Sequence, residues 1–233
     1  MSIRQISAVA AVAGLAAMAS ADTVNMKFLG TNLGRSVKIT LNGNSSDVFA
    51  GQLLHQFSGG SGTVGSQLNG VQTTFCTDLT QFVNTNFQSY NVVGVESVPN
   101  PGTAIGQAKA DMIRDIYGSA NGLQFATGNN NANNDFAAAF QMAIWSIVYN
   151  GSVTLNGPAL TLKNTNGTAI TGSLLTAFNN VATYVGSGLR NGGVVYGVTS
   201  GTFQDQLVVV PMPAPAFAAG AGLLAVAGFR RRR

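Results

Sequence analysis

The chain is poor in charge and in the residues that usually carry chemistry. Only 9% of its 233 residues are Asp, Glu, Lys or Arg, and it has one cysteine and one histidine. Exposed helix faces need many more charged residues, which excludes a helical bundle or a coiled coil. A single cysteine cannot form an internal disulfide, and one Cys with one His gives no metal-ligand spacing. We therefore expect neither a bound metal nor a cofactor.

The net charge of +4 belongs to the two ends of the chain. Arg4 and the run Arg230–Arg233 contribute five of the twelve basic residues. Residues 22–229 contain seven basic and eight acidic residues, so this stretch has a net charge of −1. It lacks the basic patch that neutralises phosphates, and we expect no nucleic-acid partner.

Glycine and apolar residues are abundant instead, with 29 glycines and a hydrophobic fraction of 45%. Such a charge-poor composition, also rich in Asn, Thr and Val, is typical of a β-rich protein outside the cytoplasm. Period-two or β-branched runs predict strands, separated by Gly and Asn clusters at Ser58–Gly62 and Asn191–Gly193. The expected strands are Val24–Leu29, Val37–Leu41, Val71–Phe75, Asn91–Val95, Val194–Val198 and Gln206–Val210.

Three segments between these strands have helical periodicity: Ala104–Tyr117, Asp135–Tyr149 and Leu174–Val185. The Asn-rich stretch Asn129–Asp135 is expected to be a solvated loop. The fold class is therefore α+β, with a β-barrel or sandwich core and a helical insertion of two to three helices. Residues 22–210 are expected to form a single domain.

The N-terminus has the layout of a secretory signal peptide. Arg4 precedes the apolar run Ile6–Met18, and Ala19-Ser20-Ala21 has the form of an A-x-A cleavage site. We expect residues 1–21 to be removed and the mature chain to begin at Asp22. A membrane anchor is the alternative, although the run is short for a membrane span.

The C-terminus has three parts: Pro211–Pro215, the apolar segment Ala216–Phe229, and Arg230–Arg233. The layout resembles the PEP-CTERM sorting signal of Gram-negative surface proteins, with Met212 where that family usually has Glu. The resemblance implies recognition by exosortase-type sorting machinery. It also implies an inner-membrane tether through residues 216–229, followed by transfer to the cell surface or extracellular matrix. An ordinary C-terminal anchor is the alternative.

The predicted helix Asp135–Tyr149 is apolar on nearly all sides, so it should be buried. Gln141 and Ser146 are the polar side chains within this run, and a buried polar group must find partners. A free cysteine outside the cell, here Cys76, is open to oxidation. An internal thioester, formed when a cysteine sulfur displaces ammonia from a glutamine side chain, uses one residue of each kind.

Two sequence motifs resemble the bacterial surface thioester domain. They are Phe75-Cys76-Thr77-Asp78 and Phe140-Gln141-Met142-Ala143-Ile144-Trp145, where Phe140 replaces the usual Thr. The resemblance implies a surface adhesin that captures amines, typically lysine side chains, on a partner. Cys76 would then be the sulfur leaving group and Gln141 the acyl donor. The product is a covalent cross-link without turnover, so the protein is not expected to be an enzyme.

Further roles follow from the thioester hypothesis. Phe75, Phe136, Phe140 and Trp145 would exclude water from the bond. Backbone N–H groups near the start of the helix Asp135–Tyr149 would stabilise the oxyanion. His55 and Asp78 are candidates for a base, although His55 is expected to be a surface or half-buried residue.

A second interpretation assigns no thioester. Cys76 is then a small core residue and Gln141 only hydrogen-bonds to a loop. The protein would be a structural or carbohydrate-associated component of the extracellular matrix. A secreted hydrolase is the weakest hypothesis, because no acid–base constellation is visible and Ser146 is not in a G-x-S-x-G motif.

Overall fold

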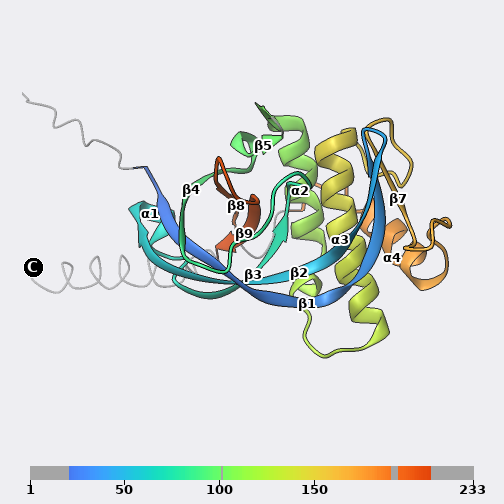
Figure 1. Cartoon of the computed structure of the whole chain (residues 1–233), viewed down its shortest axis with the longest axis horizontal. Helices are drawn as coiled ribbons and strands as arrows, with labels where there is room; N and C mark the ends of the chain where they lie inside the picture. The colour runs from blue at the N-terminus through green and yellow to red at the C-terminus, as the bar shows by residue number, and fades with distance from the viewer. Residues whose placement is uncertain (1–20, 101, 190–193, 211–233) are drawn as a thin grey trace, which may run out of the picture.

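The computed structural model describes residues 21–100, 102–189 and 194–210 (Figure 1). Three segments of interest lie outside this part of the chain: the body of the expected signal peptide, the Asn191–Gly193 separator and the expected sorting tail 211–233. Among the helices that are described, none has the length and apolarity that crossing a bilayer requires. The expected membrane segment 216–229 is not among them.

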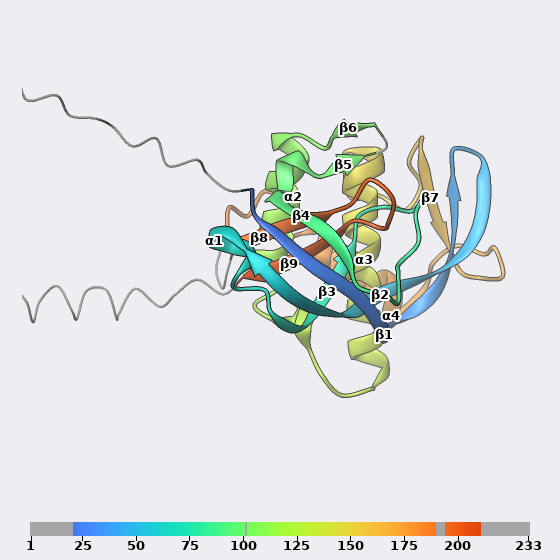
Figure 2. The ribbon, with the colours of Figure 1, turned by 60° about the vertical axis from the view of Figure 1, so that its left-hand side comes forward.

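One antiparallel sheet dominates the fold, in the order β2-β3-β9-β8-β4-β1-β7. Because β1 also pairs with β2, the first six of these strands close into a barrel, and β7 extends β1 beyond it (Figure 2). The strands are β1 Thr23–Leu41, β2 Asn44–Ser61, β3 Gly70–Cys76, β4 Gln88–Gly94, β7 Leu160–Lys163, β8 Val194–Thr199 and β9 Gln206–Val210; β5 Pro99–Asn100 and β6 Thr103–Ala104 form a separate small hairpin.

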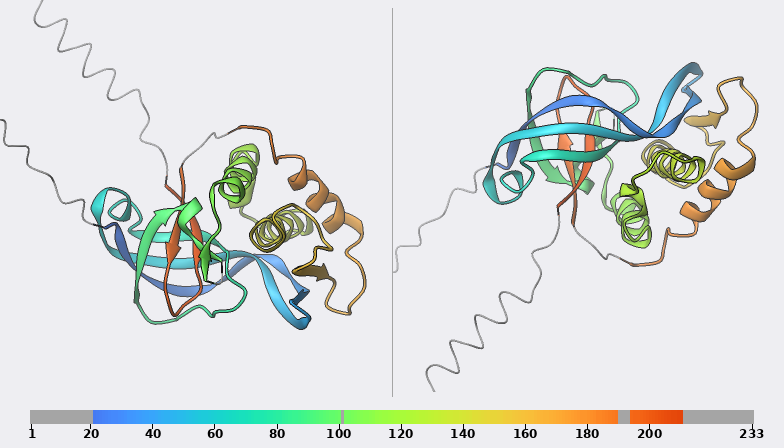
Figure 3. Two further views of the ribbon diagram at one scale, coloured as in Figure 1. Left: turned by 90° about the horizontal axis from the view of Figure 1, so that it is seen from above. Right: turned by 90° about the horizontal axis from the view of Figure 1, so that it is seen from below.

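The principal helices lie together on one side of the barrel (Figure 3). Three of them follow β4 in the sequence and precede β8, so they form an insertion between two neighbouring barrel strands. The helices are α1 Gly62–Gly65, α2 Gln107–Ser119, α3 Asn131–Asn150 and α4 Gly172–Ala182, with short 3-10 turns η1 Val95–Ser97 and η2 Leu123–Phe125. The expected α+β class with a helical insertion is confirmed, and the sheet core is a barrel.

The apolar residues form two cores. A small one fills part of the barrel and includes Met26, Phe57 and Tyr90. The larger one lies between the barrel and the helices, and α3 is at its centre, packed against β1, β2 and α4. From Ala137 to Val148 every residue of α3 is buried. Any polar side chain on this part of α3 must therefore find its partners inside the protein.

The β1–β2 hairpin differs from expectation. β1 runs without interruption through two expected strands, and β2 was not predicted because it contains few β-branched residues. Most of Ser58–Gly62, expected to be a loop, belongs to β2. Pairing with β1 along nearly its whole length supplies the backbone hydrogen bonds that its sequence does not indicate. Asn42 and Gly43, with φ of 48° and 86°, make the turn, as expected for an Asn-Gly hairpin.

The start of α3 also differs from expectation. The helix begins at Asn131 rather than Asp135, because the side chain of Asn130 accepts a hydrogen bond from the Asn133 N–H at 2.9 Å. Part of the expected Asn-rich loop is thus the first turn of the helix. The C-terminal end of α3 lies where the sequence predicts it, with Gly151 in the left-handed conformation at φ 74°.

Candidate functional site

Cys76 and Gln141 are 65 residues apart in sequence and in direct contact in the structure. Cys76 is the last residue of β3, and Gln141 lies in the middle of α3. The Cys76 N–H donates to Gln141 Oε1 at 2.9 Å, and Gln141 Nε2 donates to the Cys76 carbonyl at 2.7 Å. Both residues are buried, with exposed fractions of 2% and 0%. The structure holds them as a free thiol and a free carboxamide.

The local strand geometry explains why a side-chain amide fits at this position. The next residue, Thr77, donates its N–H to the carbonyl of Asp205 just before β9. Successive N–H groups of a strand point to opposite sides, so the Cys76 N–H points away from β9. β2 is the neighbour on that side, but its ladder with β3 ends at Leu53↔Thr74. Gln141 therefore takes the place of a strand neighbour for Cys76.

The Cys76 sulfur has two polar neighbours. Its S–H donates to the carbonyl of Asp78 at 2.8 Å. The indole N–H of Trp145 is buried without a hydrogen-bond partner among the described residues, but its proximity to the sulfur lowers the pKa of the thiol. Burial is the largest influence and acts in the opposite direction, so the pKa of Cys76 is well above that of an ordinary cysteine. The sulfur is therefore a neutral thiol at neutral pH.

The two hydrogen bonds at Gln141 have chemical consequences for its carboxamide. A donor aimed at Oε1 polarises the carbonyl and would stabilise the oxyanion that forms when a nucleophile adds to it. This donor is the Cys76 N–H. The expectation that N–H groups at the start of the helix would serve as donors is wrong. Gln141 is ten residues past the first residue of α3, about 15 Å along the helix axis.

Aromatic rings pack on one side of the pair. The ring centroids of Phe75 and Phe140 are 4.9 Å apart, and Tyr117 of α2 packs edge-on against Phe140 at the same separation. Phe136 stacks on Phe140 at 6.2 Å but is only half-buried. Tyr117 was missed by the sequence reasoning because nothing in its local sequence shows that α2 reaches β3.

A cavity of about 330 Å³ reaches Cys76 from the other side. Cys76 and Trp145 contribute to its lining, and the remaining lining is largely apolar. Phe82, on the loop between β3 and β4, also lines the cavity and is 85% exposed. The sulfur of Cys76 thus has a route of approach from the surface.

The two candidate bases are placed differently. His55 is buried, with only 1% of its surface exposed, so the expected surface or half-buried position is wrong. Its Nδ1 is 2.8 Å from Thr74 Oγ1, and burial lowers its pKa to about 4. The Asp78 carboxylate accepts from Thr80 N and Thr80 Oγ1, both at 2.7 Å, and Asp78 meets the sulfur through its carbonyl. Neither side chain is hydrogen-bonded to the thiol.

Ser146, the other polar residue of the apolar part of α3, has a structural role. Its hydroxyl is 2.7 Å from the carbonyls of both Ser152 and Thr154, and it accepts the Thr154 N–H at 2.8 Å. These bonds fix the loop that follows α3. Gln141 differs because all its polar contacts go to one reactive residue.

A second cavity, of about 420 Å³, lies beside the first, and Gln81 lines both. Asp78 and Asp205 contribute carboxylates to its wall. The pKa of Asp205 is raised to about 7, mainly by burial; the Ser200 N–H acts to lower it and the nearby Asp78 charge acts to raise it. Sequence reasoning missed Asp205, which precedes β9 and approaches Asp78 only in the folded chain.

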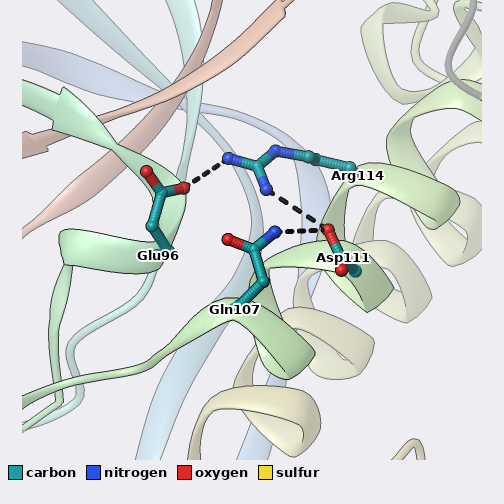
Figure 4. Close-up of polar contacts among 4 residues, drawn as sticks. All are labelled: Glu96, Gln107, Asp111 and Arg114. Carbon is teal, nitrogen blue, oxygen red and sulfur yellow. Dashed lines mark hydrogen bonds and ion pairs between the residues drawn. The ribbon is translucent and has the colours of Figure 1, made fainter.

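An ion-pair network connects α2 to the segment that precedes the β5–β6 hairpin, part of the lining of the second cavity. Arg114 of α2 bonds to Glu96 of η1 at 2.5 Å and to Asp111 at 3.4 Å, and Gln107 also donates to Asp111 (Figure 4). The β5–β6 hairpin follows η1 directly and carries Pro99 and Gly102 of the cavity wall. Arg114 thus holds the base of this hairpin against the helical layer.

No family model, curated protein or solved structure matches this chain. Among the residues that the structure describes, no group of three or more His, Cys, Asp and Glu side chains is arranged to hold a metal ion. A function is therefore inferred from the site geometry and from the two motif resemblances.

Proposed function

We propose that this protein is an exported surface or biofilm-matrix protein that acts as a covalent adhesin through an internal Cys76–Gln141 thioester. The observation that supports the proposal is the paired hydrogen bond between the Gln141 carboxamide and the backbone of Cys76. It holds the only cysteine of the chain against a carboxamide in a buried site. The proposal that the protein is exported depends on the sequence layout of residues 1–21 and 211–233.

Thioester formation is an exchange within this pair. The Cys76 sulfur adds to Cδ of Gln141, and the negative charge develops on Oε1, where the Cys76 N–H already donates. The C–N bond then breaks, the thiol proton passes to the departing nitrogen, and ammonia leaves. The products are one thioester and one ammonia. Burial protects the bond from water because bulk solvent does not reach the carbonyl.

Amine capture reverses the role of the sulfur. A primary amine on a partner adds to the thioester carbonyl, the C–S bond breaks, and the products are an amide with Gln141 and a free Cys76 thiol. The largely apolar cavity that reaches Cys76 is the approach route for an uncharged amine. The Trp145 indole, which lowers the thiol pKa, stabilises the departing sulfur.

Mass spectrometry of the purified mature protein tests this proposal. The intact mass should be lower than that of the sequence by one ammonia, and no free thiol should titrate in the native state. Addition of methylamine should raise the mass by that of one methylamine, bound as an amide, and should release one free thiol. A peptide map should place the modification on Gln141.

Variants separate the thioester from the structural alternative. Cys76→Ala and Gln141→Glu should both have the mass of the unmodified chain and should not take up methylamine, since one lacks the sulfur and the other the ammonia leaving group. Gln72→Glu, at a partly buried glutamine of β3, is the matched control and should behave like the wild type. If the wild-type protein has the unmodified mass and a titratable thiol, the thioester is excluded and the structural matrix role remains.

Sorting is tested separately from the bond. We expect the mature protein outside the cell to lack both termini, because the Pro-rich, apolar and Arg segments have the layout of a processed tail. Replacing Arg230–Arg233 by neutral residues should weaken retention at the inner membrane. Full-length protein with an intact Arg tail in the extracellular matrix would contradict processing.

A further inference from the structure

The helices α3 and α4 lie side by side (Figure 3), and a groove of about 390 Å³ lies between them. α3 supplies Asp135 and Phe136 to its lining, and α4 supplies Ser173, Thr176, Ala177 and Asn180. The four residues of α4 form one stripe, because side chains three and four positions apart share a helix face. The groove has the volume of a small-molecule site, and it shares no lining residue with the cavity that reaches Cys76.

Asp135 contributes a buried carboxylate oxygen without a partner. Only 1% of the residue is exposed. Its Oδ1 forms an ion pair with Nε of Arg35, whereas its Oδ2 is buried and accepts no hydrogen bond from any described residue. A buried acceptor without a donor is unfavourable, so a ligand in the groove that donates to this oxygen would be stabilised.

The ion pair with Arg35 indicates which donor fits. Asp135 is the only charged residue in the lining, and the guanidinium of Arg35 already compensates its charge. A second cation would therefore gain little attraction and would lose its hydration. One carboxylate is also far from the six to eight oxygen ligands that calcium takes. A neutral hydroxyl group supplies the missing donor without adding charge.

The stripe on α4 adds groups that both donate and accept. The Thr176 hydroxyl donates to the Gly172 carbonyl at 3.2 Å, which leaves its oxygen free to accept. The side chains of Ser173 and Asn180 are exposed and make no hydrogen bond within the described part of the chain. Each hydroxyl of a ligand can donate one bond and accept others, so a ligand with several neighbouring hydroxyl groups matches this lining.

Phe136 supplies the apolar part of the groove. Its ring stacks on Phe140, with the centroids 6.2 Å apart, and it is only half-buried. The ring also lines the groove, so it offers apolar surface to a ligand. A hexopyranose has hydroxyl groups around its rim and C–H groups on its faces. It therefore combines the two kinds of surface that the groove presents.

We propose that the groove between α3 and α4 binds a neutral hexopyranose unit of a carbohydrate. One hydroxyl donates to Asp135 Oδ2, neighbouring hydroxyls bond to Thr176 and Asn180, and a C–H face lies against Phe136. The site goes beyond the proposed amine capture and does not depend on the thioester.

The test titrates the mature wild-type protein with the methyl glycosides of glucose, galactose and mannose, followed by the backbone amide resonances in NMR. We expect at least one glycoside to bind with a Kd of about 1–10 mM, as suits a single sugar ring. The resonances that shift should belong to the facing parts of α3 and α4. Binding of none of the three, or shifts confined to other elements, would overturn the site. Displacement of the glycoside by guanidinium at the same concentration would show a cation site instead.

A matched pair of variants on α4 locates the contact. Asn180→Ala removes the amide from the lining and should weaken binding about fivefold, the effect of one hydrogen bond. Asn179→Ala, at the neighbouring exposed asparagine outside the lining, is the control and should bind like the wild type. Equal affinities of the two variants would overturn the assignment.

Two further variants test the carboxylate and the shape of the groove. Asp135→Asn places an N–H₂ group where the ligand hydroxyl donates, and it should weaken binding about tenfold. Ala177→Leu fills the groove without changing any charge and should abolish binding. Its amide spectrum away from the groove should stay that of the folded wild type, which separates blockage from misfolding. Wild-type affinity in Ala177→Leu would contradict binding in the groove.

Methylamine uptake distinguishes this site from the thioester. Neither Asn180→Ala nor Ala177→Leu should change its rate, because the two cavities share no lining residue. Sugar binding by a protein that takes up no methylamine would overturn the thioester and leave the groove as a carbohydrate site. Methylamine uptake without sugar binding would overturn the groove alone.

Discussion

Trp145 and Cys76 line the same cavity, and the indole of Trp145 is close enough to the sulfur to lower the pKa of the thiol. The indole N–H is buried without a hydrogen-bond partner among the described residues, and its proximity lowers the pKa of the Cys76 thiol. The two residues come from α3 and β3, and Trp145 is one helical turn past Gln141. One helix therefore supplies both the carboxamide and an indole that lines the same cavity as the sulfur.

Trp145→Phe should slow amine capture by about tenfold, because the departing sulfur loses its N–H donor. The phenyl ring keeps most of the apolar packing, so the thioester should still form. The rate of methylamine uptake by intact mass is the measurement. Phe203→Leu, at a half-buried aromatic residue that packs against the small barrel core, is the control and should leave the rate unchanged. An unaltered rate in Trp145→Phe would exclude a role for the indole at the sulfur.

Gln141→Leu in a Cys76→Ala background should lower the free energy of unfolding by about 2–4 kcal/mol, since it leaves a buried N–H and a buried carbonyl without partners. The background removes any contribution of the cross-link. Urea unfolding followed by circular dichroism gives the value. Gln72→Leu in the same background should cost much less, because Gln72 is only partly buried and makes one long hydrogen bond of 3.5 Å. Similar costs at the two positions would contradict the geometry at residue 76.

His55 should remain neutral in the folded protein down to about pH 4, since burial lowers its pKa to that value. It is the only histidine, so its ring resonances can be followed by NMR without assignment. In urea the same resonances should titrate near the unperturbed value of about 6.5. The unfolded chain then binds the proton first, so His55 lowers stability as the pH falls from about 6.5 to 4. A folded-state titration above pH 6 would contradict its burial.

Asp205 should have the opposite effect on stability. Its pKa is about 7 in the folded protein and about 4 in the unfolded chain, so the folded state holds the proton more tightly. Its contribution to stability is therefore fully present below pH 4 and is lost as the pH rises to 7. Asp205→Asn should be more stable than the wild type at pH 8 by about 1–2 kcal/mol.

The difference between Asp205→Asn and the wild type should shrink as the pH falls toward 5, where Asp205 is protonated. Urea unfolding at several pH values measures it. Asp47→Asn, at an exposed carboxylate of the β1–β2 hairpin, is the control and should show no comparable trend. A difference that is independent of pH would show that Asp205 is ionised throughout.

Local sequence determined several elements of this protein directly. The periodicity of residues 135–149 identified α3 and its burial, because a helix that is apolar on nearly all sides cannot face water. Gly151 marked its end, since the left-handed conformation there favours glycine. The strands β8 and β9 were found with nearly the observed bounds because they are runs of β-branched residues. The same pattern identified the polar Gln141 in an apolar run.

Tertiary structure decided what no local pattern records. β2 exists because β1 lies along it, and the closure of the barrel depends on pairings between strands distant in sequence. The donor to Gln141 is the backbone of Cys76 only because the β2–β3 ladder ends at Thr74, two residues before Cys76. The pairing of the strands also buries His55 and brings Asp205 close to Asp78. Charge and burial depend on which residues surround a side chain in space, and the order of residues along the chain does not specify that.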